Sequence, residues 1–207
     1  LAFDRDGLLF ATLGERSAAQ YRVLAQDLGT HLGKVIRIHD DGSVPDDNPF
    51  VGQAGALPEI WSYGHRNPQG MALHPMTGAI WTHEHGPRGG DEVAIPQAGD
   101  NHGWPIFSYG TEYSGHPITN LDEHPPEFAR PVWQWTPSIA PSGMAFYDGS
   151  AIPEWRGSLF VGALRGSSLV RLSLDGDRVT GEERMLDELG VRFRYVAVGP
   201  DGALYVL

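Results

Sequence analysis

A strand–turn–strand unit recurs along this chain, and this repeat limits the folds that the chain can adopt. Its four copies occupy segments 1–10, 71–81, 144–161 and 197–206. Each copy places apolar stretches on either side of a turn that contains Gly, which tolerates the positive φ of a tight turn at no steric cost. A second apolar pattern recurs in 33–42 and 168–176. Repetition of this kind predicts an all-β protein.

The spacing of the turns predicts a β-propeller. Gly157 and Gly202, in the third and fourth turns, are separated by the length of one propeller blade, about 40–50 residues. The longer earlier spacings indicate blades with inserted loops, which we place at 43–60 and 114–141. A β-sandwich with coincidental turns is the alternative, but only a propeller predicts that loops at one end converge on a central axis. We therefore expect residues 1–207 to form one β-propeller domain.

Composition excludes several classes of function. The net charge of −11 argues against nucleic acid or an anionic membrane surface as a partner. The chain has no apolar run of about 18 residues, which argues against a transmembrane helix. It also has no cysteine, so disulfides, zinc–thiolate sites and thiol nucleophiles are excluded.

Four arginines are candidates for binding an anion. Arg192 and Arg194 flank Phe193 in a β-like segment, so we expect both guanidinium groups on one face and the ring on the other. Arg165 follows an apolar strand in a Gly-flanked loop, and Arg66 opens the segment Arg-Asn-Pro-Gln-Gly. In a propeller all four can face one axis and bind carboxylates bidentately. Solvated surface arginines are the alternative.

The segment from Gly86 to Glu92 is a candidate loop for a hard metal ion. Carbonyl oxygens suit Ca²⁺, and Pro87 contributes a carbonyl without a competing N–H. Asp91 and Glu92 add carboxylates. Together with the Arg-Asn pair that precedes it, this loop suits a polyanionic cofactor held by a metal ion. An ordinary Gly-Pro turn is the alternative.

A pair of nearby histidines raises the question of zinc. His83 and His85 alternate along a predicted strand and therefore face the same way. The sequence offers no third ligand, and the helical spacing of a metalloprotease is absent, so we do not predict a zinc site here. His65 is interpreted either as a hydrogen-bonding residue of the core or as a ligand contact.

Six motifs follow one another along essentially the whole chain. They are Arg66-Asn-Pro-Gln-Gly-Met-Ala, Glu84-His-Gly-Pro-Arg-Gly-Gly-Asp-Glu92, Asn101-His-Gly-Trp-Pro105, Ser142-Gly-Met-Ala-Phe-Tyr147, Leu159-Phe-Val-Gly-Ala-Leu164 and Arg192-Phe-Arg194. In this order they resemble the soluble aldose sugar dehydrogenases that depend on pyrroloquinoline quinone (PQQ), in the glucose/sorbosone dehydrogenase group. The resemblance rests on all six motifs, because any one of them alone is a weak signal.

The resemblance implies a six-bladed propeller with PQQ lying across one end of its axis. The residues that would contact PQQ are Arg66, Asn67, Tyr113, Ala163, Leu164, Arg165, Arg192, Phe193 and Arg194. The carbonyls of Gly86 and Pro87 would hold the Ca²⁺ that fixes the cofactor, and Glu92 with the carbonyl of His102 would hold a second, structural Ca²⁺. Two positions depart from the family pattern, since Arg165 stands where Lys is common and His102 where Tyr is usual.

The implied reaction is oxidation of the anomeric hydroxyl of an aldose to a lactone, with hydride transfer to the quinone and Arg66 polarising its reactive carbonyl. In the family, the general-base His immediately precedes the strand that segment 1–7 matches, and none of the nine histidines here fits that motif. We therefore expect an incomplete propeller of about four blades, truncated at the N-terminus and at the C-terminus, that is inactive alone.

The resemblance also implies partners and a location. The expected cofactors are PQQ and Ca²⁺, the expected partners are an aldose sugar and an external electron acceptor, and the expected location is periplasmic or secreted. Unpaired strand edges at the cut ends predict a possible homodimer. The alternative function is a non-catalytic, Ca²⁺-binding propeller module for carbohydrate or protein. A metal-dependent lactonase is disfavoured, because such an enzyme needs acidic ligands around one axial metal and this axis is expected to be rich in Arg.

Overall fold

The computed structural model describes residues 1–119, 121 and 123–207, and its regular structure is almost entirely antiparallel β-sheet. The first sheet contains β1 (Ala2–Phe3), β2 (Leu9–Leu13), β3 (Lys34–Ile38) and β4 (Ile60–Tyr63). The second contains β5 (Pro68–Leu73), β6 (Ile80–Glu84), β7 (Asp91–Ala94) and β8 (Trp133–Trp135). The third contains β9 (Pro141–Phe146), β10 (Leu159–Ala163), β11 (Leu169–Asp175) and β12 (Arg178–Met185), and β13 (Val196–Val198) pairs with β14 (Leu204–Val206).

The helices are short and lie between strands. They are α1 (Ala19–Arg22) and the 3₁₀ turns η1 (Val23–Gln26), η2 (Pro153–Trp155) and η3 (Asp187–Leu189). Both α1 and η1 lie in the connection between β2 and β3. Among the described residues, none of these helices has the length and apolar character that crossing a membrane requires.

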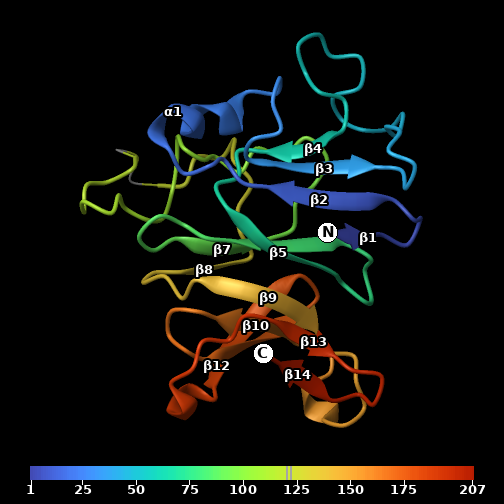
Figure 1. The fold of residues 1–207 in the computed structure, drawn as a ribbon, viewed down its shortest axis with the longest axis vertical. Coiled ribbons are helices and arrows are strands. Elements are labelled where there is room, and N and C mark those ends of the chain that lie inside the picture. Colours follow the sequence, from blue (N-terminus) through green and yellow to red (C-terminus); the bar gives the residue numbers. More distant parts are fainter. Residues whose placement is uncertain (120, 122) are drawn as a thin grey trace.

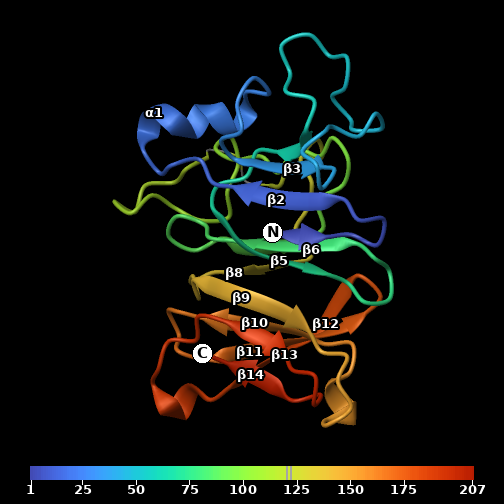
Figure 2. The same cartoon turned by 45° about the vertical axis from the view of Figure 1, so that its right-hand side comes forward.

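The sheets have the arrangement of propeller blades. Within each sheet the strands pair in chain order, so each sheet is an antiparallel meander. The first strands contact one another from sheet to sheet, β1 with β5, β5 with β9 and β9 with β13. Figures 1 and 2 show the sheets stacked in chain order, from β1–β4 through β5–β8 to β9–β12, with β13 and β14 next to the third sheet. The prediction of an all-β, propeller-like chain with about four repeats is confirmed.

Each sequence repeat corresponds to the first hairpin of one blade. These hairpins are β1–β2, β5–β6, β9–β10 and β13–β14. The four turn glycines all have positive φ, at Gly7 (82°), Gly78 (75°), Gly157 (82°) and Gly202 (77°), which is the backbone conformation that Gly adopts without strain. The second sequence pattern corresponds to β3 and β11, the third strands of their sheets.

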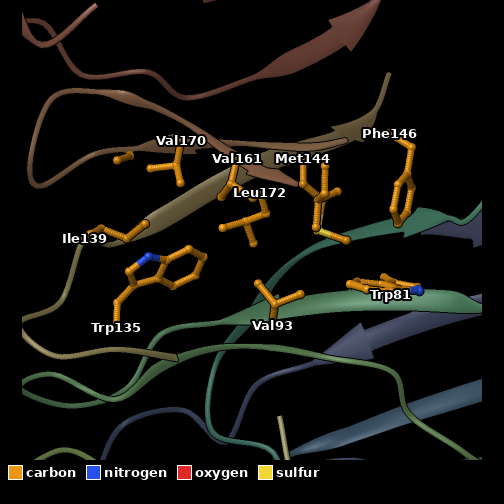
Figure 3. Packing of buried hydrophobic residues seen from close by; sticks show 11 residues of the cluster. Trp81, Val93, Trp135, Ile139, Met144, Phe146, Val161, Val170 and Leu172 are labelled. Carbon is orange, nitrogen blue, oxygen red and sulfur yellow. The ribbon is translucent and has the colours of Figure 1, made fainter. Parts of the chain in front are cut away.

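The largest apolar cluster lies between the second and third sheets. Figure 3 shows Trp81 and Val93 on one side of this layer and Met144, Phe146 and Val161 on the other. The rings of Trp81 and Phe146 meet edge to face, with centroids 5.4 Å apart. Each large apolar side chain that is fully buried here contributes about 1.5–3 kcal/mol, so this cluster fixes the two sheets against each other.

Two long excursions leave the sheets. One spans 39–59 between β3 and β4, and the other spans 95–132 between β7 and β8. They agree in part with the insertions expected at 43–60 and 114–141, but the second of those predictions also covered residues that form β8. Asn120 and Asp122, which fall within that predicted insertion, lie outside the described residues.

Candidate functional site

The predicted site segments gather at one end of the first strands. The start of β5 pairs with the end of β6 through Pro68 and Glu84, and the start of β9 pairs with the end of β10 through Pro141 and Ala163. A hydrogen bond joins these ends across the neighbouring sheets, since His85 Nε2 donates to the Pro141 carbonyl at 2.7 Å. Loops that are far apart in the sequence therefore meet around one end of the first strands, as a propeller predicts.

Arg66 is buried at this end and faces the Gly-Pro loop. Its Nη1 donates to the carbonyls of His85 and Gly86 at 2.8 and 2.9 Å. Its guanidinium lies 5.3 Å from the ring centroid of Trp104, within the range of a cation–π interaction. Arg66 thus bonds directly to the Gly86 carbonyl, which is one of the two predicted ligands of the metal ion.

Glu84 holds the backbone of Arg66 and Asn67 in place. One carboxylate oxygen accepts the backbone N–H groups of these two residues at 2.6 and 3.1 Å, and the other is 3.2 Å from His65 Nδ1. Burial alone raises the pKa of Glu84, but the hydrogen bonds from His65, Arg66 and Asn67 outweigh it and lower the pKa below the ordinary value. The carboxylate is therefore held ionised inside the protein.

The Gly86–Pro87 loop is shaped by Asp91. This carboxylate accepts the backbone N–H of Gly86 at 2.9 Å, and its other oxygen accepts the hydroxyl of Ser138 at 2.5 Å and the N–H of Ala140 at 2.8 Å. A Cβ at Gly86 would lie 2.1 Å from the nearest backbone oxygen of the same loop. Because no side chain fits there, the loop can fold tightly only with Gly at this position.

Tyr113 lies on a loop that is bonded to the residue following Pro87. Arg88 and Thr111 exchange two backbone hydrogen bonds, of 3.0 and 3.1 Å. Tyr113 follows on the same loop, and the residue is 70% exposed. The structure therefore places the predicted Tyr113 contact close to the Gly-Pro loop, with its ring open to solvent.

The segment from Ala163 to Arg165 is held at the same end. The backbone N–H of Leu164 donates to Ala140, and that of Phe193 donates to the carbonyl of Ala163 at 3.3 Å. Ala163 and Phe193 are buried, whereas the side chain of Arg165 is exposed. Arg165 lines a cavity of about 560 Å³, and the other residues that line it include Arg88, Tyr109, Thr111, Thr136 and Ser138.

Arg192 and Arg194 are exposed on either side of the buried Phe193, as the alternation predicted. The segment 191–195 is irregular rather than a strand, because β13 begins only at Val196. Arg194 lines a cavity of about 300 Å³ with Gln69 and Ser142. Arg66 and Asn67 line another cavity, of about 330 Å³, so Arg66, Arg165 and Arg194 line separate cavities rather than one.

Glu92 and His102, the predicted ligands of the second metal ion, line one small cavity of about 20 Å³. Burial and the nearby carboxylates of Glu84 and Asp91 raise the pKa of Glu92 well above its ordinary value. Burial and the neighbouring ring of His65 lower the pKa of His102 well below its ordinary value. The imidazole is therefore neutral, burial favours the protonated form of Glu92, and Glu84 is the carboxylate that stays ionised beside this cavity.

His83 and His85 do not form a metal site with a third ligand among the described residues. Burial lowers the pKa of His83 to about 3, and His85 bonds a backbone carbonyl. The group with metal-binding geometry consists instead of His65, Glu84 and His102, whose ligand atoms lie within 4.8 Å of one another. Sequence spacing gave no signal for this group, because its members come from different elements.

Sequence reasoning also missed Glu15, which lies next to Arg66. Glu15 is 1% exposed, and its backbone N–H donates to the Arg66 carbonyl at 3.0 Å. Burial raises the pKa of this carboxyl, although the charge of Arg66 and the N–H of Ser17 oppose the rise. Its position just after an apolar strand is the only local signal that the sequence offers.

The fold and the site define a β-propeller protein with arginines, loop carbonyls and carboxylates gathered at one end of its first strands. The model of the Glucose / Sorbosone dehydrogenase family matches residues 1–207, and the chain belongs to that family.

Relatives and solved structures agree with this assignment. The chain is 50% identical to the aldose sugar dehydrogenase YliI of Escherichia coli over 100% of this chain and 55% of the relative. A crystal structure of a glucose dehydrogenase matches with a TM-score of 0.96 and 55% identity, over 100% of this chain and 59% of that one. The PQQ-bound form of an aldose sugar dehydrogenase from Streptomyces coelicolor matches with a TM-score of 0.75 and 32% identity, over 99% and 53%. The chain thus spans little more than half the length of these proteins.

Proposed function

We propose that this chain forms the PQQ- and Ca²⁺-binding part of a dehydrogenase that oxidises aldose sugars at the anomeric hydroxyl to lactones. The proposal rests on one observation, which is that Arg66 and the Gly86 carbonyl are bonded at the end of the first strands where the other predicted contacts also lie. Relatives named aldose sugar dehydrogenase and a PQQ-bound neighbour support it. An external electron acceptor and a periplasmic or secreted location belong to the same proposal.

The arginines at this end fit the carboxylates of PQQ. Arg165, Arg192 and Arg194 are exposed, and none of them forms an ion pair with a carboxylate within residues 1–119, 121 and 123–207. Their planar guanidinium groups can therefore bind an incoming carboxylate bidentately without breaking an existing pair. Arg66 donates to the carbonyls of His85 and Gly86, so it would orient this loop and supply the positive charge that polarises the reactive carbonyl of the quinone.

The Gly-Pro loop fits a hard cation. The Gly86 carbonyl accepts one hydrogen bond from Arg66 and keeps a second lone pair, and the carbonyl of Pro87 accepts no hydrogen bond among the described residues. Both oxygens suit Ca²⁺. When bound, PQQ supplies the two-electron acceptor for sugar oxidation. The residues of this chain bind and orient it, and we assign the general base to none of its histidines.

The first test removes an exposed arginine without disturbing the fold. Arg165→Gln is expected to weaken PQQ binding by about 10- to 100-fold in the presence of Ca²⁺, because a charge-assisted hydrogen bond is lost. Fluorescence titration of the purified protein with PQQ measures the change. Arg156→Gln is the matched control, since Arg156 is also exposed but precedes β10, whereas Arg165 follows it. Equal PQQ affinity in both variants would exclude this role for Arg165.

The second test distorts the Gly86–Pro87 loop, which is proposed to bind Ca²⁺. Gly86→Ala is expected to abolish the Ca²⁺-dependent part of PQQ binding, because the added Cβ would meet loop oxygens at 2.1 and 2.4 Å. Titrations with Ca²⁺ and with a chelator measure this part separately. Gly181→Ala in β12 is the control, because a Cβ there makes only an ordinary contact at 3.9 Å. If Ca²⁺ has no effect on PQQ binding in the unmodified protein, the non-catalytic module becomes the better explanation.

We extend the proposal to a second, structural cation at Glu92 and His102, which the family resemblance assigns to Ca²⁺. The fit is supported by the small cavity that both residues line and by the carboxylates around it. The donor groups at this position differ from those of the Gly86–Pro87 loop, because they include carboxylate and imidazole groups as well as backbone oxygen.

A further inference from the structure

Tyr113 lies in a turn that is closed by two backbone hydrogen bonds of 2.8 Å. The N–H of Glu112 donates to the carbonyl of His116, and the N–H of Gly115 donates to the carbonyl of Glu112. This turn directly follows the residue that bonds to the Gly-Pro loop. Because Tyr113 is 70% exposed, packing does little to fix its ring. The position of the ring therefore depends on what holds the turn.

One side chain of this turn forms an ion pair with the connection between β2 and β3. Arg22, the last residue of α1, donates through both terminal nitrogen atoms to the two carboxylate oxygens of Glu112, and the Nη2–Oε2 distance is 3.2 Å. Such a two-point contact fixes the orientation of both groups as well as their distance. The side chains are 20% and 30% exposed, so solvent and salt screen this pair less than a pair on the open surface.

The connection that carries α1 and η1 gives this ion pair a fixed base. Gln26 in η1 and Asn101 exchange two side-chain hydrogen bonds, of 2.9 and 2.8 Å, and Gln26 also donates to the Trp104 carbonyl at 2.7 Å. From β3, the Nζ of Lys34 donates to the carbonyl of Ala25 at 2.9 Å. The connection is thus bonded both to the first sheet and to the excursion after β7, so an ion pair that starts from it can hold the turn in place.

The ion pair also lies next to Arg66, through the buried ring of Trp104. Two guanidinium groups are within cation–π distance of this ring, that of Arg22 at 5.4 Å and that of Arg66 at 5.3 Å from the centroid. Like charges around one ring repel each other, and the carboxylate of Glu112 offsets this repulsion by bonding to Arg22. This bond raises the pKa of Arg22, and Tyr113 adds to the rise, which indicates that its phenol is close to the pair.

We propose that Arg22 and Glu112 are positioning residues, whose ion pair holds the Tyr113 turn beside the Gly-Pro loop in the orientation that PQQ binding requires. The inference rests on the proposed function, because it assigns the pair an effect on PQQ. The pair acts through Tyr113 and not by contact with the ligand. A turn that is ordered before the ligand arrives does not have to be ordered at the expense of binding free energy.

Two single variants separate positioning from a simple effect of charge. Arg22→Met removes a positive charge near an anionic ligand, and Glu112→Gln removes a negative one. An effect of charge alone would weaken PQQ binding in the first variant and strengthen it in the second. Loss of a positioning contact weakens binding in both, and we expect about tenfold in each. Fluorescence titration of the full chain with PQQ, in the presence of Ca²⁺, measures these affinities.

Rescue and control variants complete the test. The double variant Arg22→Glu with Glu112→Arg reverses the pair and is expected to recover most of the PQQ affinity. Glu183→Gln is the matched control, because it breaks the pair with Arg171, an arginine whose side chain is also 20% exposed, and it is expected to leave the affinity unchanged. Amide hydrogen exchange without PQQ reports on the turn directly, and we expect the N–H groups of Glu112 and Gly115 to exchange faster in Arg22→Met.

Three results would overturn the inference. They are tighter PQQ binding in Glu112→Gln, unchanged PQQ affinity in both single variants, and unchanged amide exchange of the turn in Arg22→Met. If Arg22→Met does not fold, Arg22→Lys replaces it, since Lys keeps the charge but loses the two-point contact. Failure of the unmodified chain to bind PQQ would instead contradict the proposed function, and amide exchange would then decide whether the pair orders the turn.

Discussion

Replacing Glu84 with Ala is expected to lower the free energy of unfolding by about 3–5 kcal/mol. The carboxylate accepts the backbone N–H groups of Arg66 and Asn67. Neither N–H has another acceptor among the described residues, so the Ala variant leaves both unpaired. It also removes the contact to His65. Urea denaturation followed by tryptophan fluorescence measures the loss.

Two variants separate this effect from a general loss of acidic charge. Glu84→Gln keeps one oxygen that can accept the same two N–H groups, so we expect it to recover about half of the lost stability. Glu183→Ala removes an exposed carboxylate that pairs with Arg171 on the surface, and we expect a change below about 1 kcal/mol. A Glu84→Ala variant that is as stable as Glu183→Ala would contradict the role assigned to Glu84.

Replacing Lys34 with Met is expected to lower the free energy of unfolding by about 2–3 kcal/mol. Lys34 is the single lysine of the chain and is fully buried in β3. Its Nζ donates to the carbonyls of Leu24, Ala25 and Leu32 at 3.0, 2.9 and 2.7 Å. Two of these carbonyls also accept backbone N–H groups, but that of Leu32 has no other donor among the described residues. The ammonium group thus ties the α1–η1 connection to the first sheet.

The pH dependence of stability provides an independent check on Lys34. Burial lowers its pKa from 10.5 to about 8 in the folded protein. Between these two values the unfolded chain binds more protons than the folded chain, so this contribution to the free energy of unfolding rises with pH in that window. Lys34→Met is expected to lack the rise. Arg178→Met, at an exposed ion pair, is the control and should retain it.

The hairpins of the blades were predictable because their signal is local. In each repeat, Gly7, Gly78, Gly157 and Gly202 mark a turn whose backbone only Gly adopts easily, and apolar strands flank it. The outer strands were less predictable. The strand β8 lies in a stretch rich in Pro that looks like an insertion, and it is a strand because it pairs with β7, which the local sequence does not reveal.

The candidate site was predictable in its segments and not in its contacts. The sequence motifs identified Arg66, the Gly86–Pro87 loop and Arg165 as site residues, and these residues lie at one end of the first strands in the structure. The distribution of the arginines over several cavities was not predicted, because it depends on the depth of each side chain relative to its neighbours. Arg66 is buried beside Trp104, whereas Arg165 extends to the surface.

By itself, the sequence determined the repeated hairpins, the all-β class and the residue types that suit a polyanionic ligand and a hard cation. These depend on turn chemistry, strand periodicity and donor type, which neighbouring residues specify. Tertiary structure alone decided that Glu84 holds the backbone of Arg66 and that His102 stacks on His65 beside a cavity. Such contacts join residues from different strands and loops, and they exist only because sheet register and the long excursion after β7 bring those residues within hydrogen-bonding distance.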